Sequence, residues 1–339
     1  MKPGCTILGR TPIDPRVPQA GWTVSGAPHS LWHVIDARPA TARETESWLE
    51  GWRARLQAWY TPYGPSDLWV DHHIQRRLRS HNNAAQAFVF VVTSDGDPVG
   101  ILAAAQVENE GPLTTVINDL WVAPEHRRRG YATSAVEWTR SWAASRTKRL
   151  AMVTDPTDPA HMALFGQNPL RAQMMIKQVS GVDSLPDGHT ARPMTEAEFV
   201  PWRAEQVRGY AGDIFGSGLL PLPEATTRAE TQFDELLPQG MRTADNTFLC
   251  VDFGGEVVAT IWLSHHYHPG TSWVFGVEVS PQSRGRGHGR AAMLLGEQST
   301  LTAGDTHLAL NVFGNNTTAI GLYDRLGYGT VDQQRSVDL

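Results

Sequence analysis

Cysteine is nearly absent from this sequence: of 339 residues, only Cys5 and Cys250 carry a thiol. Two distant cysteines exclude a disulfide framework and a four-cysteine metal cage, so a reducing cytoplasm is the expected compartment. The N-terminal segment 1–22 lacks the apolar run of about 7–15 residues that a secretory signal needs. No stretch approaches the roughly 18 apolar residues of a membrane-spanning helix. We therefore expect neither secretion nor a membrane partner.

An excess of positive charge is also missing. The formal net charge is −6, from 29 basic and 35 acidic residues, so general nucleic-acid binding is not expected. Any basic cluster must then be a local site. The chain is 41% hydrophobic and holds 12 tryptophans, as a folded globular protein does. At about 100–200 residues per domain, its length predicts two domains.

One unit occurs twice along the chain. Segments 120–138 and 277–295 align without a gap at an offset of 157 positions, which places Arg127 on Arg284 and Gly130 on Gly287. The strand-like and helix-like segments that follow align at an offset of 158. Such internal similarity predicts two copies of one fold.

The boundary between the copies is predicted in 180–189, where glycine, proline, serine and aspartate cluster. This gives an N-terminal domain over 1–180 and a C-terminal domain over 190–339. In each copy, strands joined by tight turns come first and strands alternating with helices come later. That order predicts the α/β class with a mixed sheet (α+β mixed sheet) in each domain.

A cluster of arginine and glycine follows the same strand in both copies. The pattern Arg-x-x-Gly-x-Gly/Ala opens a helix, where free N–H groups and glycines suit a phosphate and arginines add charge-assisted bonds. A dinucleotide fingerprint fails because Arg290 stands at its third glycine, and a P-loop fails because Gly-Lys-Ser/Thr is missing. A solvated basic turn is the remaining alternative, and its repetition in one context disfavours it. The pattern predicts a pyrophosphate cradle.

At these residues the sequence resembles the GNAT superfamily of N-acetyltransferases, twice. The phosphate-binding motif of that family is matched by Arg127, Gly130 and Ala132, and by Arg284, Gly287 and Gly289. A later family motif is matched only in the second copy, by Asn316, Ala319, Tyr323, Gly327 and Tyr328. The tandem layout is similar to that of mycothiol synthases and of tandem acetyltransferases in clavulanic acid biosynthesis.

The resemblance implies that acetyl-CoA, or another acyl-CoA, binds in a V-shaped opening between the fourth and fifth strands, with up to two ligands per chain. The residues implied in the second copy are Val277, Glu278, Val279, Arg284, Gly285, Arg286, Gly287, His288, Gly289, Arg290 and Asn316. Those implied in the first copy are Leu120, Trp121, Val122, Arg127, Arg128, Arg129, Gly130, Tyr131, Ala132 and Thr133.

The two copies differ where a proton donor is needed. At the offset of 158, Phe165 stands opposite Tyr323 and Asp158 opposite Asn316. A thiolate leaving group needs a proton, which a tyrosine hydroxyl can supply and a phenylalanine cannot. We therefore expect the second domain to be catalytic, with Tyr323 as general acid. The first domain is expected to bind acyl-CoA as a structural or regulatory ligand.

The general base is harder to assign. Trp273 and Phe275 occupy the strand positions that would face the acyl group, and strand alternation turns Glu278 away unless a bulge intervenes. The neighbouring strand ends in three histidines, His265, His266 and His268, of which His266 is the base candidate. No nearby carboxylate or cysteine completes a metal site, so no metal is expected.

Two polar pairs lie outside these motifs. Asn118 and Asp119, on the fourth strand of the first copy, are expected to bind a ligand or to pair with polar neighbours. His72 and His73 lie among arginines and predict a solvated helix face.

The sequence thus predicts an acyl-CoA-dependent N-acyltransferase that acts on an amine of a small molecule by direct transfer in a ternary complex. Actinobacterial secondary metabolism, including antibiotic biosynthesis, is the expected context. The alternative is a non-catalytic acyl-CoA-binding or sensor protein. Acetylation of a protein is a weaker third option, and monomer and homodimer remain open.

Overall fold

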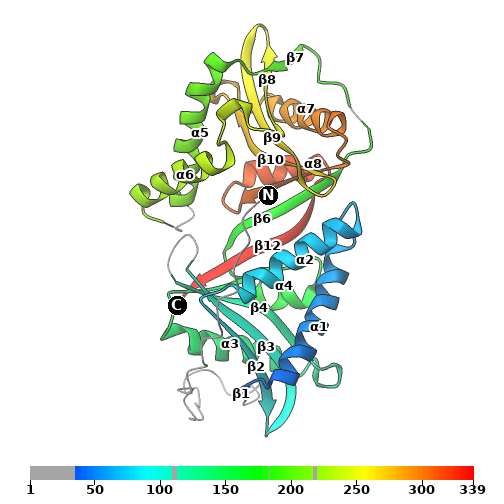
Figure 1. The fold of residues 1–339 in the computed structure, drawn as a ribbon, viewed down its shortest axis with the longest axis vertical. Helices are drawn as coiled ribbons and strands as arrows, with labels where there is room; N and C mark the ends of the chain where they lie inside the picture. Colours follow the sequence, from blue (N-terminus) through cyan, green and yellow to red (C-terminus); the bar gives the residue numbers. More distant parts are fainter. Residues whose placement is uncertain (1–34, 109–112, 182, 217–219) are drawn as a thin grey trace.

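The computed structural model describes residues 35–108, 113–181, 183–216 and 220–339 (Figure 1). Cys5 and the N-terminal segment 1–22 lie outside these residues. The described strands form one twelve-stranded sheet, in the order β1-β2-β3-β4-β5-β12-β6-β11-β10-β9-β8-β7. Only the pairs β4–β5 and β10–β11 are parallel among these described strands, so the sheet is mixed and the α/β prediction is confirmed.

Each half supplies the same succession of elements. The first half contains β1 (Asp36–Pro39), α1 (Ala42–Tyr60), α2 (Asp67–Asn82), β2 (Gln86–Ser94), β3 (Asp97–Val107), β4 (Thr114–Val122), α3 (Tyr131–Ala144), β5 (Arg149–Thr154), α4 (Pro159–Phe165) and β6 (Leu170–Gln178). The second half contains β7 (His189–Pro193), α5 (Glu196–Gly216), α6 (Leu222–Leu236), β8 (Asn246–Phe253), β9 (Glu256–His268), β10 (Thr271–Val279), α7 (His288–Thr302), β11 (His307–Phe313), α8 (Thr317–Arg325) and β12 (Gly329–Asp338).

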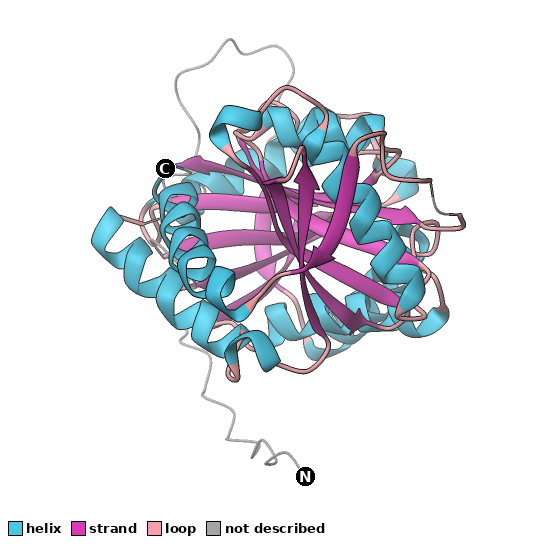
Figure 2. Cartoon of the chain, turned by 90° about the horizontal axis from the view of Figure 1, so that it is seen from above, coloured by secondary structure: helices cyan, strands magenta, loops and turns pink. Residues whose placement is uncertain are grey.

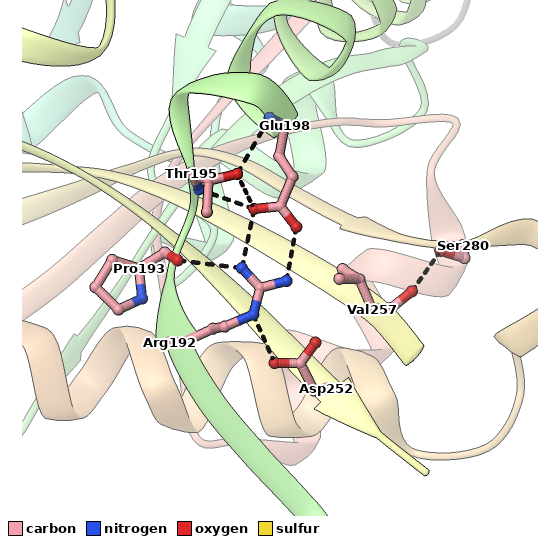
Figure 3. A network of polar contacts seen from close by, with 7 residues as sticks. All are labelled: Arg192, Pro193, Thr195, Glu198, Asp252, Val257 and Ser280. Carbon is pink, nitrogen blue, oxygen red and sulfur yellow. Dashed lines mark hydrogen bonds and ion pairs between the residues drawn. The ribbon is translucent and has the colours of Figure 1, made fainter. Parts of the chain in front are cut away.

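The first long helix of each half begins with the same capping box. Thr195 accepts a hydrogen bond from the Glu198 backbone, and the Glu198 carboxylate binds back to Thr195 and to Arg192 of β7 (Figure 3). Thr41, Glu44 and Arg38 repeat this arrangement 154 positions earlier. A capping box satisfies N–H groups that a helix start leaves unpaired, which explains why both helices begin there.

The two halves exchange their last strands. β6, which ends the first half, pairs with β11 of the second, while β12, which ends the second half, pairs with β5 of the first. β6 and β12 also pair with each other, and together they cross the middle of the molecule between the two groups of helices (Figure 1). The sequence repeat did not predict this exchange, because a strand pattern does not specify its partner.

Helices lie on both sides of the strands (Figure 2). In the second half, α5 and α6 pack on one face through Trp202, Phe233 and Trp262, and α7 and α8 pack on the other through Met293 and Tyr323. In the first half, α3 and α4 cover one face, while α1 and α2 cover the other and also reach β6, β11 and β12. The α1–α2 pair therefore has core contacts with both halves of the sheet.

The strands and helices expected from hydrophobic spacing are found, with two additions. β1 and β7 are short edge strands, and periodicity did not indicate them because they bury little apolar surface. β7 begins at His189, which closes the expected boundary segment 180–189.

Candidate functional site

Both parallel strand pairs open into a V. β10 pairs with β11 only from Thr271 to Val274, and the β10 residues from Phe275 to Val279 have no partner in β11. β4 pairs with β5 only from Thr114 to Ile117, so its end opens in the same way. The predicted backbone segments Val277, Glu278 and Val279, and Leu120, Trp121 and Val122, therefore line two equivalent openings.

An uncapped helix N-terminus stands at the end of the second opening. Gly287 is the N-cap of α7 with φ +87°, and no side chain caps this helix. The first helical hydrogen bond comes from the Ala291 N–H, so the N–H groups of His288, Gly289 and Arg290 precede the helical ladder. These groups and the positive end of the helix dipole suit an anion.

The first half builds the same cradle. Gly130 is the N-cap of α3 with φ +85°, again without a side-chain cap, and the first helical bond comes from Ser134. Arg128 adopts φ +63° where Gly285 adopts φ +77°. A non-glycine residue in the left-handed region costs about 1–2 kcal/mol, so this backbone path is retained against a local penalty.

The arginines of the motif have divided tasks. The Nε groups of Arg284 and Arg127 donate to the carbonyl oxygens of Val279 and Val122, at 3.2 and 3.1 Å, and so close the loop onto its own strand. Exposed arginine side chains surround the cradles; they are Arg284, Arg286 and Arg290 in the second half and Arg127, Arg128 and Arg129 in the first.

Two residues of the predicted binding set turn their side chains inward. The His288 ring is buried, and its Nδ1 lies 2.8 Å from Nε2 of His189. Tyr131, at the equivalent position, is buried in the core of the first half. For these two residues, only the backbone N–H belongs to the cradle.

Tyr323 lies close to the second cradle. It is buried in the cluster against which Val277 and Val279 pack, and a Cβ atom on Gly289 would lie 3.2 Å from Leu322, its neighbour in α8. Burial raises the pKa of Tyr323 to about 12, so its hydroxyl stays protonated at neutral pH.

Phe165 occupies the equivalent place in the first half, packed in the cluster that Leu120 and Val122 adjoin. Asn316 and Asp158 are the N-caps of α8 and α4, where their side chains accept hydrogen bonds from Ala319 and Ala160. Asn316 thus has a structural task at the rim of the opening. Its predicted contact with the ligand stays a prediction.

A β-bulge in β10 decides where Glu278 points. The register with β9 shifts between Val274 and Gly276, so that Phe275 is the extra residue. Past the bulge, the Glu278 carboxylate faces α5, where its Oε2 accepts a hydrogen bond from Gln206 at 2.5 Å. Phe275 also packs on the α5 side. The bulge therefore puts Glu278 on the same side of the sheet as Phe275.

Burial raises the pKa of the Glu278 carboxyl, and repulsion from Glu205 adds to this effect. Arg284 and the hydrogen bond from Gln206 act in the opposite direction. Strand alternation predicts that Glu278 points away unless a bulge intervenes, and the structure contains that bulge.

The three histidines of β9 lie at the other end of the strand. His268 pairs with Thr271 at the start of β10, seven residues of strand and on the order of 20 Å from Glu278. Both the backbone N–H and Nδ1 of His266 bind the Asp305 carboxylate, at 2.8 and 2.9 Å. His265 binds Ser272 and Thr247. His266 therefore lies far from the unpaired end of β10 that carries Glu278, and its role as general base stays a prediction.

His73 corrects the expectation of a solvated histidine face. Its side chain is fully buried and stacks on Trp69 at a centroid distance of 3.8 Å, and His268 packs against it at 4.9 Å. His72 is half-buried, and its ring lies 4.6 Å from that of His268. Within the described residues, no group of three or more His, Cys, Asp or Glu side chains is arranged to hold a metal ion.

In the first half, the region equivalent to Glu278 and Gln206 is filled by the protein itself. Asp119 accepts hydrogen bonds from Trp48 and Arg55, and Asn118 binds His81 at 3.0 Å. Trp121 stands at the position of Glu278, 157 residues earlier. These polar groups therefore pair with protein neighbours, which was one of the two expectations for Asn118 and Asp119.

No helix in the described part of the chain is both long and apolar enough to cross a membrane.

Among similar proteins, a mycothiol acetyltransferase from Streptomyces avermitilis is 26% identical over 272 residues, covering 76% of this chain and 81% of that protein. A solved GCN5-related N-acetyltransferase from Sphaerobacter thermophilus has a TM-score of 0.50 at 17% identity, covering 91% of this chain and 97% of that chain.

A solved tandem GNAT protein from the clavulanic acid biosynthesis pathway has a TM-score of 0.44 at 17% identity, covering 90% of this chain and 98% of that chain. The model of the acetyltransferase (GNAT) family matches residues 48–167 and again residues 218–328. Each matched segment contains one of the two cradles, and together they make up more than half of the chain. The chain therefore belongs to the acetyltransferase (GNAT) family.

Proposed function

We propose that the second half transfers an acetyl group from acetyl-CoA to an amine of a small molecule, and that the first half binds acyl-CoA as a structural or regulatory ligand. One observation carries this division of labour. In the second half, Glu278 stands on the unpaired end of β10, and Tyr323 is buried in the cluster against which Val277 and Val279 pack. The first half has Trp121 and Phe165 at those positions.

The cradles fit the pyrophosphate of a coenzyme. Three N–H groups precede the helical ladder at the start of both α3 and α7, and the glycine N-caps of these helices make no side-chain cap. The exposed arginines named above add positive charge on a chain that is acidic overall. The proposal is therefore up to two acyl-CoA molecules per chain.

The residues of the second half can move the two protons that the reaction requires. When bound, acetyl-CoA supplies the thioester that an amine attacks. An amine with a pKa near 10 is protonated at neutral pH, and the Glu278 carboxylate can accept that proton. Since burial raises the pKa of Glu278, it is a stronger base than an exposed glutamate. The protonated Tyr323 hydroxyl can donate to a thiolate.

A non-catalytic, ligand-binding role is the second candidate. We call the proposed acyl-CoA site at β4 and α3 the first seat and that at β10 and α7 the second seat. The residues of the first half favour the non-catalytic role for the first seat. There the Asp119 carboxylate is already paired with Arg55 and Trp48, and Phe165 replaces the tyrosine, so the pair of proton-transfer groups proposed for the second half is not repeated. A cytoplasmic location and a role in secondary metabolism or antibiotic biosynthesis stay predictions.

Native mass spectrometry with acetyl-CoA and other acyl-CoA species tests the seats. It is combined with an assay for coenzyme A release in the presence of a panel of primary amines. We expect two ligands per chain at saturation and release of coenzyme A that depends on the amine. One ligand per chain would contradict the first seat, and two ligands without release for any amine would favour the binding protein.

A further inference from the structure

Both polar atoms of the Gln206 side-chain amide, the nitrogen and the oxygen, lie against β10, just after its bulge. Its Nε2 donates to Oε2 of Glu278 at 2.5 Å. Its Oε1 lies at Gly276, two residues before Glu278, where a Cβ atom would stand only 2.9 Å away. Glycine at 276 therefore leaves the space that the amide oxygen occupies, and the amide has little freedom to turn.

The fold itself does not require this pair. The first half builds the same helix with the same capping box, and β4 has a bulge at the matching place, between Ile117 and Asp119. With the capping boxes aligned at 154 positions, Trp52 of α1 stands at the position of Gln206, and Trp121 stands at that of Glu278. Two tryptophans satisfy the architecture there, so the glutamine and the glutamate need a different explanation.

The surroundings of Gln206 indicate which side of the opening it serves. One turn further along α5, Tyr210 approaches Phe313 at the end of β11, with ring centroids 6.3 Å apart. At the end of α5, a Cβ atom on Gly216 would lie 3.8 Å from Asn315 in the loop after β11. Helix α5 thus extends over the opening from β10 to β11, and Gln206 lies where it meets β10.

We propose that Gln206 is a positioning residue that holds the Glu278 carboxylate in one orientation at the opening. Its hydrogen bond to Oε2 of Glu278 leaves Oε1 of Glu278 to accept the proton of the acceptor amine. The inference rests on the proposed function. The hydrogen bond is made to the charged form of the carboxyl, and it therefore also sets how readily Glu278 takes up a proton.

The charged groups around Glu278 allow a test in which two substitutions should shift its pKa in opposite directions. Glu205, the neighbour of Gln206 in α5, raises the pKa of Glu278 by repulsion, while Arg284 after β10 and the Gln206 hydrogen bond lower it. Gln206→Leu roughly keeps the volume and removes the donor, so Glu278 should protonate at higher pH. Glu205→Gln removes the repulsion, so Glu278 should protonate at lower pH.

The experiment uses the full chain with ¹³C-labelled glutamate carboxyls and no coenzyme. The Glu278 resonance is identified by its loss in Glu278→Gln, and its titration midpoint is then measured in each variant. We expect a midpoint higher by a few tenths to about one pH unit in Gln206→Leu, and a smaller decrease in Glu205→Gln. The acid limb of kcat/KM for coenzyme A release should move with the midpoint.

Gln75→Ala is the matched control, because Gln75 also donates to a carboxylate, that of Asp71 at 3.2 Å, on an outer face of the first half. It should leave the Glu278 midpoint unchanged. An unchanged midpoint in Gln206→Leu overturns the inference, whatever the activity. Failure of the proposed function has another signature, since the midpoints would then shift while the unsubstituted chain released no coenzyme A with any amine.

Discussion

Arg149 of β5 forms an ion pair with Asp338 of β12, with Nε and Oδ1 3.0 Å apart. These residues belong to different halves, and the contact forms because the last strand of the chain is inserted beside the fifth strand of the first half. Arg149 is buried and Asp338 is largely exposed, so the ion pair itself contributes little stability. The strand ladder around it, with Leu150 and Met152 of β5 buried, contributes more.

The strand exchange predicts that the two halves fold together. Expressed separately, segments 1–180 and 190–339 should each lack the strand beside their fifth strand and fail to give a cooperative thermal transition. Co-expression should restore one shared transition. Calorimetry on the full chain and the fragments checks this expectation, and two independent transitions in the full chain would contradict it.

Tyr323→Phe should lower kcat for coenzyme A release by about 10²–10⁴-fold, the usual effect of losing a general acid, and leave ligand binding at the second seat nearly unchanged. The reason is that only the hydroxyl is removed from a buried ring. Phe165→Tyr is the matched change in the first half, and it should not alter the rate. Equal turnover in Tyr323→Phe and the unsubstituted chain would show that Tyr323 is not the donor.

Gly287→Ala should weaken the second seat, because φ +87° costs a residue with a Cβ atom about 1–2 kcal/mol. Space is not the obstacle, since no atom lies within 4 Å of the new Cβ. Gly130→Ala, at φ +85°, should weaken the first seat alone. Ligand counting by native mass spectrometry separates the two. If Gly130→Ala also abolishes turnover, the first seat is more than a structural site.

Lys177→Met should destabilise the protein by about 2–4 kcal/mol, near the typical cost of removing one partner of a buried ion pair. Lys177 of β6 donates to both carboxylate oxygens of Glu297 in α7, at 2.7 and 2.8 Å, and Glu297 is almost fully buried. The double variant Lys177→Met/Glu297→Leu should recover only part of this loss, because it removes the unpaired carboxylate but also the acceptor of the buried Tyr328 hydroxyl. Urea unfolding measures both, and a double variant no more stable than Lys177→Met would argue against an unpaired charge as the cause.

Acidification should destabilise the contact between α2 and the β9–β10 hairpin. Burial, with nearby positive charge from Arg76, lowers the pKa of His73 and of His268 to about 3, and burial lowers that of His81 to about 4. In the unfolded chain these rings take up protons below about pH 6.5. The unfolded state thus binds more protons, and the free energy of unfolding should fall from pH 6.5 towards 5, by on the order of 1–2 kcal/mol per histidine.

Urea unfolding at pH 7 and pH 5 measures this loss. His73→Phe can keep the stacking on Trp69 without a titrating group, and it should reduce the difference between the two pH values. Glu44 and Glu198, whose pKa values fall to about 2 through hydrogen bonds with Arg38 and Arg192, protonate in the unfolded chain only near pH 4. These two carboxyls therefore contribute little to the change in the free energy of unfolding between pH 5 and 7. An unchanged difference between the two pH values in His73→Phe would exclude His73 as the cause.

Local patterns were enough to predict most of the fold and part of the site. Hydrophobic spacing located the helices and all but two of the described strands, and the Arg-x-x-Gly-x-Gly/Ala stretches located both cradles. These features succeed because the residues that build them are neighbours in one strand, loop and helix. The prediction that His73 lies on a solvated helix face was wrong, because the hairpin that covers it lies nearly 200 residues away in the sequence.

By itself, the sequence determined the family, the repeat, the two cradles and the difference between Tyr323 and Phe165, since each depends on residue types at fixed local spacing. Only the tertiary structure decided which strands pair across the halves and toward which helix the Glu278 carboxylate points. Strand partners depend on contacts between distant segments, and one bulged residue reverses the direction of every side chain after it. For that reason Glu278, together with Gln206 from another element, could be recognised only once β10 was seen beside α5.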